Sequence, residues 1–212
     1  VGRVVVALQD PNPQVAGRGI AHLRAQGITV DVLEGELNAA ARTLNCGFVK
    51  RMEQALPFVR LKLAMSPDGR TAMASGESQW ITGPAARADV QVLRARSSAI
   101  ITGADTVMTD HARLTVRADV LPLDDEQHAL ALSRAPVRIM IDGRLRVPTD
   151  MAFFQAGPVW VVTYQTPPAN TEQIEYIQVP ERHGHVDLHA VLIELARRGI
   201  NELMVEAGPQ LA

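Results

Sequence analysis

Short apolar runs rich in β-branched residues recur along the chain, and helical segments separate them. The runs that we expect to form strands are Gly2–Leu8, Ile28–Leu33, Phe58–Met65, Ser98–Thr102, Val137–Ile141, Val159–Thr163, Ile174–Val179 and Glu202–Val205. Helical patterns lie between them, over Gly19–Gln26, Leu37 to about Met52, Thr82 to about Arg96 and Asp187–Arg198. Strands that alternate with helices indicate an α/β fold with a mostly parallel sheet. Ligands of such sheets bind at the carboxyl ends of the strands.

Several side chains have expected places in these elements. Thr82 and Asp187 are suited to the N-cap position of their helices, and Pro84 suits the first helical turn. The second helix is expected to have one apolar face, formed by Leu37, Ala41, Leu44 and Phe48. The last helix is expected to bury Leu188, Val191, Leu192 and Leu195. Alternation in the third strand puts Arg60 and Lys62 on the face opposite Leu61 and Met65.

Composition excludes several classes of protein. Hydrophobic residues make up 47% of the 212 residues and the net charge is -2, which argues against a nucleic-acid binder with a broad basic surface. No apolar run approaches the roughly 20 residues that span a bilayer, so we expect a cytoplasmic protein without a membrane partner. The single cysteine, Cys46, excludes an intramolecular disulfide, and His183, His185 and His189 lack the further ligands of a metal site.

Two strand-to-helix turns have the glycine that phosphate-binding turns need, at Gly103 and at Gly208. Neither matches the dinucleotide-binding fingerprint, so each is also compatible with a purely structural turn. Arg94 and Arg117 could bind a phosphate in a bidentate manner or could be surface arginines. Lys62 in an apolar strand and Glu206 at a strand end are candidate functional groups for which the pattern alone gives no partner.

Four strings then occur in one order: DPNPQVAGRG from Asp10, LKLAMSPDGRTA from Leu61, SGESQWIT from Ser75 and VEAGP from Val205. Together they closely resemble the bifunctional diaminohydroxyphosphoribosylaminopyrimidine deaminase / 5-amino-6-(5-phosphoribosylamino)uracil reductase of riboflavin biosynthesis, over essentially the whole chain. In that family a zinc deaminase precedes a reductase whose fold resembles dihydrofolate reductase.

The resemblance implies two parts. Residues 1–53 are expected to be the end of a cytidine-deaminase-like α/β domain, and residues 54–212 an NADPH-dependent, dihydrofolate-reductase-like domain that is incomplete at its C-terminus. Zinc would belong only to the absent deaminase portion, whose His-Ala-Glu and Pro-Cys motifs do not occur here. Asp10 and Asn12 match deaminase substrate contacts, and both ends of the chain are expected to be cuts through folded structure.

The resemblance also implies a set of reductase site residues. The matching substrate-binding positions are Ser78, Arg94, Leu114, Arg117 and Glu206, with the arginines suited to the ribose phosphate. The matching NADPH-binding positions are Ala64, Trp80, Thr106, Asp110, Gly143 and Gly208. Gly143 departs from the family, which commonly has a serine there, and Pro67 stands where leucine is usual.

The implied reaction is hydride transfer from NADPH to C1 of the ribosyl group of the substrate, which opens that group to a ribityl chain. Our hypothesis is that Lys62 and Glu206 polarise or protonate the opened sugar. Two other interpretations stay open: a non-catalytic NADPH-binding or partner-docking module, and a reductase of dihydrofolate reductase type with a different pterin or pyrimidine substrate. A homodimer is possible, as the family suggests.

Overall fold

The computed structural model describes residues 1–71, 81–208 and 211, and these divide into two compact units. The first unit comprises Val1–Phe58 with Leu195–Asn201, and the second comprises Val59–Glu194 with Glu202–Ala212. Each is described by itself below. In the described part of the chain no helix is both long and apolar enough to span a membrane.

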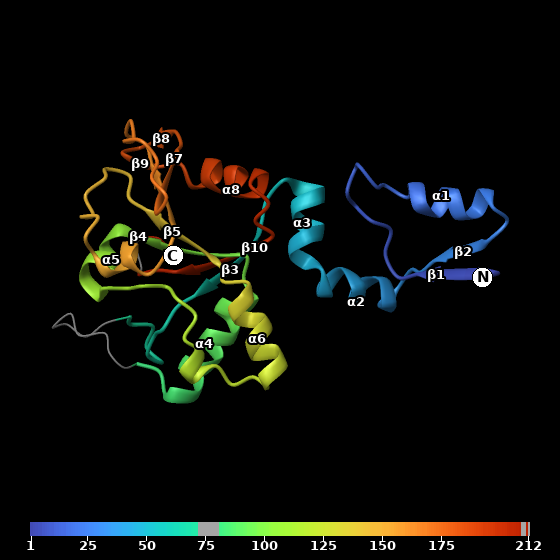
Figure 1. Ribbon diagram of the computed structural model, residues 1–212, viewed down its shortest axis with the longest axis horizontal. Coiled ribbons are helices and arrows are strands. Elements are labelled where there is room, and N and C mark those ends of the chain that lie inside the picture. Colours follow the sequence, from blue (N-terminus) through green and yellow to red (C-terminus); the bar gives the residue numbers. More distant parts are fainter. Residues whose placement is uncertain (72–80, 209–210, 212) are drawn as a thin grey trace. The chain divides into compact units, whose positions relative to one another are not determined.

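The first unit begins with a β-α-β element (Figure 1). Strand β1 (Arg3–Val6) pairs in parallel with β2 (Thr29–Val32), and helix α1 (Arg18–Ala25) connects them. The pairing places Val5 opposite Asp31, and the Asp31 carboxylate accepts a 2.6 Å hydrogen bond from Arg3 Nε. Helices α2 (Glu36–Leu44) and α3 (Cys46–Gln54) follow.

One continuous helix from Leu37 to Met52 was the wrong expectation, because the segment breaks at Asn45. The Asn45 backbone leaves helical geometry with φ −109° and ψ 25°, and its Nδ2 donates to the Ala41 carbonyl at 2.9 Å. An asparagine side chain that bonds a nearby carbonyl competes with the helical pattern and ends the helix. The shared apolar face is also not buried, since Leu37 and Leu44 are 63% and 81% exposed.

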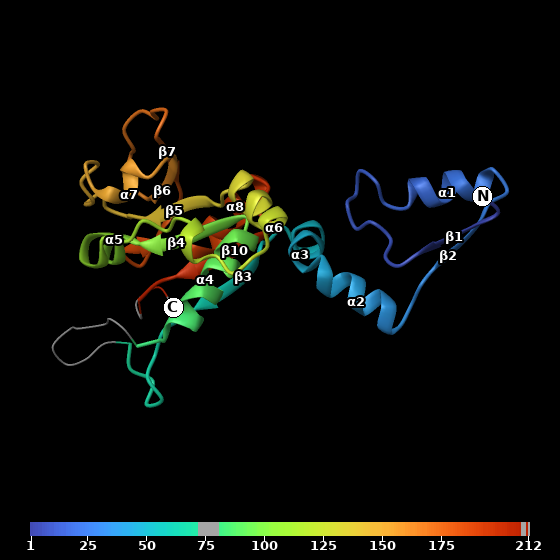
Figure 2. The same ribbon diagram turned by 60° about the horizontal axis from the view of Figure 1, so that its bottom comes forward.

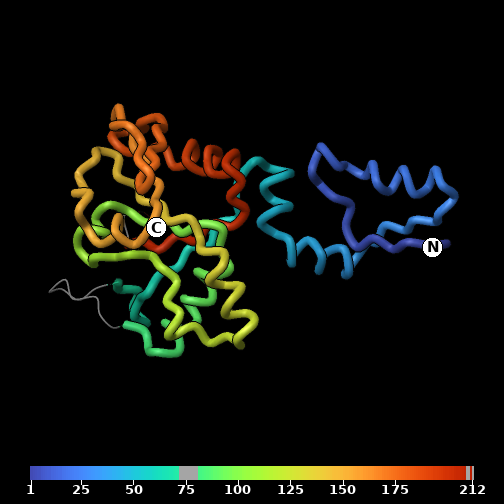
Figure 3. Tube along the Cα trace, in the orientation of Figure 1, coloured from blue at the N-terminus to red at the C-terminus, as the bar shows by residue number. Residues whose placement is uncertain are grey.

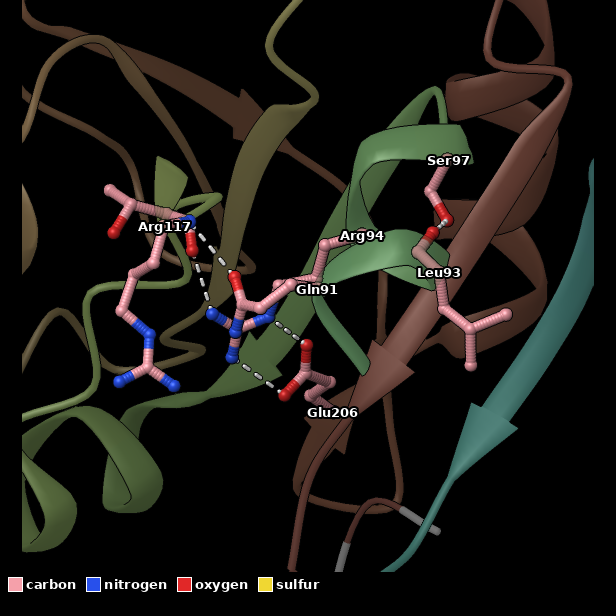
Figure 4. A network of polar contacts seen from close by, with 7 residues as sticks. Gln91, Leu93, Arg94, Ser97, Arg117 and Glu206 are labelled. Carbon is pink, nitrogen blue, oxygen red and sulfur yellow. Dashed lines mark hydrogen bonds and ion pairs between the residues drawn. The ribbon is translucent and has the colours of Figure 1, made fainter. Parts of the chain in front are cut away.

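The second unit is built on a six-stranded sheet in the order β3-β10-β4-β5-β6-β7. The strands are β3 (Phe58–Lys62), β4 (Ala99–Gly103), β5 (Val137–Ile141), β6 (Val159–Thr163), β7 (Ile174–Gln178) and β10 (Glu202–Glu206). The pairs from β10 through β7 are parallel. Figure 4 shows β3 and β10 pointing in the same direction. The predicted parallel α/β sheet is therefore confirmed.

Helices lie on both faces of this sheet. Helices α4 (Pro84–Arg96) and α6 (Asp125–Ser133) are on one side, and the first turns of α8 (Leu188–Arg197) are on the other (Figures 1 and 2). Shorter elements are α5 (Ala104–Asp110), η1 (Ala118–Val120), α7 (Ala152–Gln155) and the antiparallel hairpin of β8 (Glu181–Arg182) and β9 (His185–Val186). Helix α7 connects β5 with β6 and lies in the orange part of the tube in Figure 3.

The core of the second unit consists of the apolar strand residues and two phenylalanines of α7. Ile100, Met140, Val161 and Met204 are fully buried on four strands. Phe153 and Phe154 pack edge to face with centroids 5.7 Å apart. Side chains of this kind are worth roughly 1.5–3 kcal/mol each when fully buried, so these central strands form a rigid base for the loops at their ends.

Some expected boundaries and orientations differ from the structure. The third strand ends at Lys62 rather than Met65, and Leu61 is 48% exposed. Gly83, not Thr82, occupies the cap position before α4 and makes no side-chain cap bond. Asp187 does cap α8, since its Oδ1 accepts from the His189 and Ala190 backbone N–H groups, but Leu188 is exposed rather than buried.

Candidate active site

The carboxyl ends of four strands meet at one edge of the second sheet. The β4–β5 pairing places Gly103 opposite Ile141, and the β5–β6 pairing places Ile141 opposite Val162. On the other side of β4, Val205 lies opposite Ile101, so Glu206 follows beside the end of β4. Chain segments that leave this edge are the places where a parallel sheet offers side chains and backbone groups to a ligand.

Glu206 and Arg94 form a two-bond ion pair at this edge (Figure 4). Arg94 Nε lies 2.5 Å from Glu206 Oε1, and Arg94 Nη2 lies 2.8 Å from Oε2. The side chains are only 15% and 11% exposed, so little solvent screens the pair. Paired, parallel hydrogen bonds of this type are among the strongest in proteins. Sequence patterns predicted both residues in the site but did not predict that they bind each other.

The pair restricts what each residue can do. Arg94 also donates from Nη1 to the Thr115 carbonyl at 2.8 Å, so three of its five N–H donors are already engaged. Both oxygens of Glu206 accept from Arg94, which fixes the carboxylate in place and compensates its charge. In this geometry Arg94 orients Glu206 and the Thr115 loop, rather than standing open to a phosphate.

Hydrogen bonds connect the loop His111–Arg117 to helix α4 and to strand β5 of the sheet. The Arg117 backbone N–H donates to Oε1 of buried Gln91 at 2.9 Å, three residues before Arg94 on α4 (Figure 4). Leu114 is buried, and its φ of 54° is left-handed. A non-glycine residue in that region is strained, and the hydrogen bonds on either side hold the loop in this conformation.

Arg117 itself is exposed, and its guanidinium forms no hydrogen bond or ion pair with any residue that the structure describes. Figure 4 shows its side chain directed away from the Arg94–Glu206 pair. Among the two predicted phosphate-binding arginines, Arg117 is thus the one with its donors open.

Lys62 lies at the carboxyl end of β3, beside β10, and its side chain is half-buried. It forms no bond with another described residue. Two residues earlier, Arg60 makes a 3.4 Å ion pair with Glu202 of β10. Side chains two apart on a strand share a face, so Lys62 lies on the face of β3 that carries this ion pair, nearer the edge where Glu206 ends β10. Ala64 follows β3 and is half-buried.

Three of the predicted cofactor residues, Thr106, Asp110 and Gly143, lie in the segments that follow β4 and β5. Thr106 and Asp110 lie on α5, where Thr106 is half-buried and Asp110 is exposed. At Gly103 an added Cβ would meet no atom within 4 Å, so open space lies over this backbone. The same holds at Gly208.

Gly143 is different, because an aromatic ring covers it. A Cβ at Gly143 would lie 2.8 Å from Cε1 of Tyr164, closer than carbon atoms pack. Tyr164 Oη accepts a 2.9 Å hydrogen bond from Arg144 Nε, and the Gly143 carbonyl accepts one from Thr163 Oγ1 at 2.9 Å. Glycine at position 143 is therefore matched to this tyrosine.

Asp142 and Thr102 are buried polar residues near this edge that had not been predicted. Asp142 Oδ2 accepts from the Val147 backbone N–H at 2.8 Å, while Asp142 Oδ1 and Thr102 Oγ1 are buried without a hydrogen-bond partner among the described residues. Burial, with a smaller contribution from the Asp142 charge, raises the pKa of Tyr176. A lone aspartate directly after an apolar strand was the available signal for Asp142.

Arg138 is a further buried polar residue, and it is the second residue of β5. It donates to the carbonyls of Arg113 at 3.0 Å and Phe153 at 2.6 Å, and also to those of Gly157 and Pro158. Its guanidinium lies 5.2 Å from the centroid of the Phe153 ring. Desolvation lowers the pKa of Arg138. By bonding the Arg113 carbonyl, this side chain fixes the start of the loop that carries Arg117.

The remaining predicted residues lie elsewhere. In the first unit Asp10 Oδ1 accepts from the Asn12 backbone N–H, and Asn12 Oδ1 accepts from the Gln14 N–H, so both side chains stabilise the local turn. Ser78 and Trp80 lie outside the described residues. No group of histidine, cysteine and acidic residues that could hold a metal occurs within residues 1–71 and 81–208.

Comparison with known proteins is consistent with this geometry. The family model described as the RibD C-terminal domain matches residues 57–212. The riboflavin biosynthesis proteins RibD of Escherichia coli and Haemophilus influenzae are 48% and 45% identical over all of this chain, which covers 58% and 57% of them. The chain thus spans a little over half the length of these relatives.

Solved structures give the same result. Acinetobacter baumannii RibD superimposes with a TM-score of 0.82 at 41% identity, over all of this chain and 56% of that one. A Thermotoga maritima protein described as a diaminohydroxyphosphoribosylaminopyrimidine deaminase/5-amino-6-(5-phosphoribosylamino)uracil reductase has a TM-score of 0.76 at 30% identity, over 98% and 54% of the two chains. The yeast riboflavin biosynthesis reductase Rib7, at 21% identity and a TM-score of 0.57, shares the fold.

Proposed function

Because the chain belongs to the RibD C-terminal domain family, we propose that it carries the NADPH-dependent reductase of riboflavin biosynthesis. The substrate is 5-amino-6-(5-phosphoribosylamino)uracil, and the product carries a ribityl chain in place of the ribosyl group. The main support for the proposal is the set of groups at the carboxyl edge of the sheet. The Arg94–Glu206 ion pair, the Arg117 loop and Lys62 lie there, together with a glycine turn at Gly103 that has open space over its backbone.

The residues at this edge fit a dinucleotide. Space is open over Gly103 and Gly208, and the buried Asp142 Oδ1 has an unused acceptor position among the described residues. Thr106 and Asp110 on α5, and the Gly143–Tyr164 pair that follows β5 and β6, would contact it. NADPH, when bound, supplies the hydride, and the protein aligns the reacting carbons and excludes competing reactions.

Arg117 is assigned to the phosphate of the substrate, because its donors are open where those of Arg94 are not. An exposed guanidinium can bind a phosphate with two parallel hydrogen bonds. Arg117→Ala should raise KM for the phosphorylated substrate about tenfold or more while kcat changes less. Arg182→Ala, which removes an exposed arginine of β8, is the control and should leave KM unchanged.

Lys62 is assigned to proton transfer at the opened sugar, and Glu206, held in place by Arg94, to contact with the substrate through its remaining acceptor positions. This modifies the original hypothesis for Glu206, since a carboxylate engaged on both oxygens by Arg94 is poorly placed to deliver a proton. Positioned acid–base groups contribute roughly 10²–10⁴-fold to rate. Lys62→Ala should therefore lower kcat by at least about a hundredfold with little change in the NADPH dissociation constant.

Two results would separate this proposal from its alternatives. A chain that binds NADPH tightly yet oxidises none with substrate would be a nucleotide-binding module. A chain that reduces dihydropterins as readily as the phosphorylated pyrimidine would be a reductase of different specificity. The proposal requires substrate-dependent oxidation that disappears when the phosphate is removed from the pyrimidine.

A further inference from the structure

A cavity of about 750 Å³ opens between α4 and α6, well away from the candidate active site. It is lined in part by Ser97 and Ser98, which directly precede β4, and by Ala135, which lies just before β5. The candidate active site lies at the opposite, carboxyl ends of these strands. Five residues at about 3.3 Å each separate the two ends by roughly 15 Å, so this amino-edge cavity is a separate feature.

The walls of the amino-edge cavity are largely apolar. Val92 and Ala95 of α4 face Leu130 and Ala131 of α6 across it, with Leu123 from the preceding loop. Leu130 is 57% exposed, although it lies on a helix that packs beside α4. An exposed leucine in the wall of a concavity loses solvent contact when an apolar body enters, which favours binding by roughly 25 cal/mol for each Å² that is covered.

Two arginines add charge to these apolar walls. Arg96 ends α4 and Arg134 follows α6, and neither forms an ion pair or hydrogen bond with another residue that the structure describes. None of the eleven residues that line the cavity is acidic. The acidic residues of α6 lie in its first turn, at the end opposite Arg134, and Asp124 there accepts the Gln127 backbone N–H at 2.8 Å.

From this combination we propose that the amino-edge cavity is a second binding site, for a small organic anion with an apolar body and one carboxylate, phosphate or sulfonate group. Its volume lies within the roughly 300–1,000 Å³ of small-molecule sites. The two guanidinium groups bind the anion and the leucine walls take the apolar body. The site does not depend on the reductase assignment.

Helix α4 gives such a site a connection to the rest of the unit. Val92, Ala95 and Arg96 line the cavity, while Gln91 and Arg94 on another face of the same turns hold the Arg117 loop and Glu206. A ligand in the cavity therefore contacts the helix that orients the candidate active site.

Anilinonaphthalene sulfonate, a planar organic anion, is the probe for this site. Its dissociation constant is measured by fluorescence titration of the whole chain at fixed ionic strength, for the wild type and for Arg96→Ser/Arg134→Ser. The matched control is Arg18→Ser/Arg182→Ser, which removes two exposed arginines elsewhere. Loss of charge-assisted hydrogen bonds should raise the dissociation constant about tenfold or more in the cavity variant and leave the control unchanged.

Leu130→Asp is a second variant, chosen because the exposed leucine can be replaced with little effect on folding. It keeps both arginines but removes an apolar wall and adds a negative charge, so it should weaken binding as well. Hydrogen–deuterium exchange should show that the probe protects residues 92–98 and 127–135. Equal affinity in the cavity and control variants, protection confined to other segments, or no binding to the wild type would overturn the proposal.

Discussion

Removing Arg94 tests how strongly the buried ion pair organises the candidate active site. In Arg94→Met the Glu206 carboxylate, 11% exposed, loses both of its hydrogen bonds, and the Thr115 carbonyl loses a third. Leaving one partner of a buried pair uncompensated costs about 3–5 kcal/mol. With a slope of about 2 kcal/mol per M in urea, the unfolding midpoint should fall by roughly 1.5–2.5 M.

The double variant distinguishes this explanation from a loss of packing. Arg94→Met/Glu206→Met removes both charges, so it should be less destabilised than the sum of the two single variants by about 2 kcal/mol or more. Urea unfolding followed by tryptophan fluorescence gives the four free energies of the cycle. Additive losses, with a coupling below about 0.5 kcal/mol, would refute the claim that the two residues act as a pair.

Three further predictions follow from other residues. Gly143→Ala should lower the unfolding free energy by about 1–3 kcal/mol, because the added methyl group overpacks against the ring of Tyr164. In urea unfolding, the double variant with Tyr164→Ala should recover part of the lost free energy. Arg138→Met removes the donor from one buried carbonyl, that of Phe153, and from three partly buried ones. It should cost about 3 kcal/mol, whereas Arg138→Lys should cost less. The pKa of Tyr176 is raised in the folded protein. Its contribution to stability is therefore complete below the ordinary tyrosine pKa of about 10 and is lost as the pH rises through the folded value. Asp142→Asn should lower the pKa of Tyr176 in an absorbance titration, and an unchanged pKa would exclude an effect of the Asp142 charge.

Much of the fold follows from local sequence. The bounds of β5 and β6 agree with the predicted Val137–Ile141 and Val159–Thr163, because short runs rich in β-branched and apolar residues end at polar or turn-forming residues. Asp187 caps α8 as its position indicates. The break at Asn45 was not predictable from periodicity, because it depends on a side-chain hydrogen bond that competes with the helix.

The site residues named from the sequence remain predictions, and the contacts between them were not predictable. Arg94 and Glu206 each have a recognisable place, at a helix end and at a strand end, yet 112 residues separate them and only the folded sheet brings them together. The fit of Gly143 beneath Tyr164 and the four carbonyls around Arg138 likewise depend on packing between elements far apart in the chain. Sequence patterns indicate which groups reach an edge, and tertiary packing decides which groups remain open to a ligand.

The most direct test of the reductase assignment is NADPH consumption by this chain in the presence and absence of 5-amino-6-(5-phosphoribosylamino)uracil, with identification of the product. We predict oxidation only when the substrate is present, formation of the ribityl compound, and loss of turnover in Lys62→Ala. Absence of substrate-dependent oxidation by protein that binds NADPH would contradict the assignment.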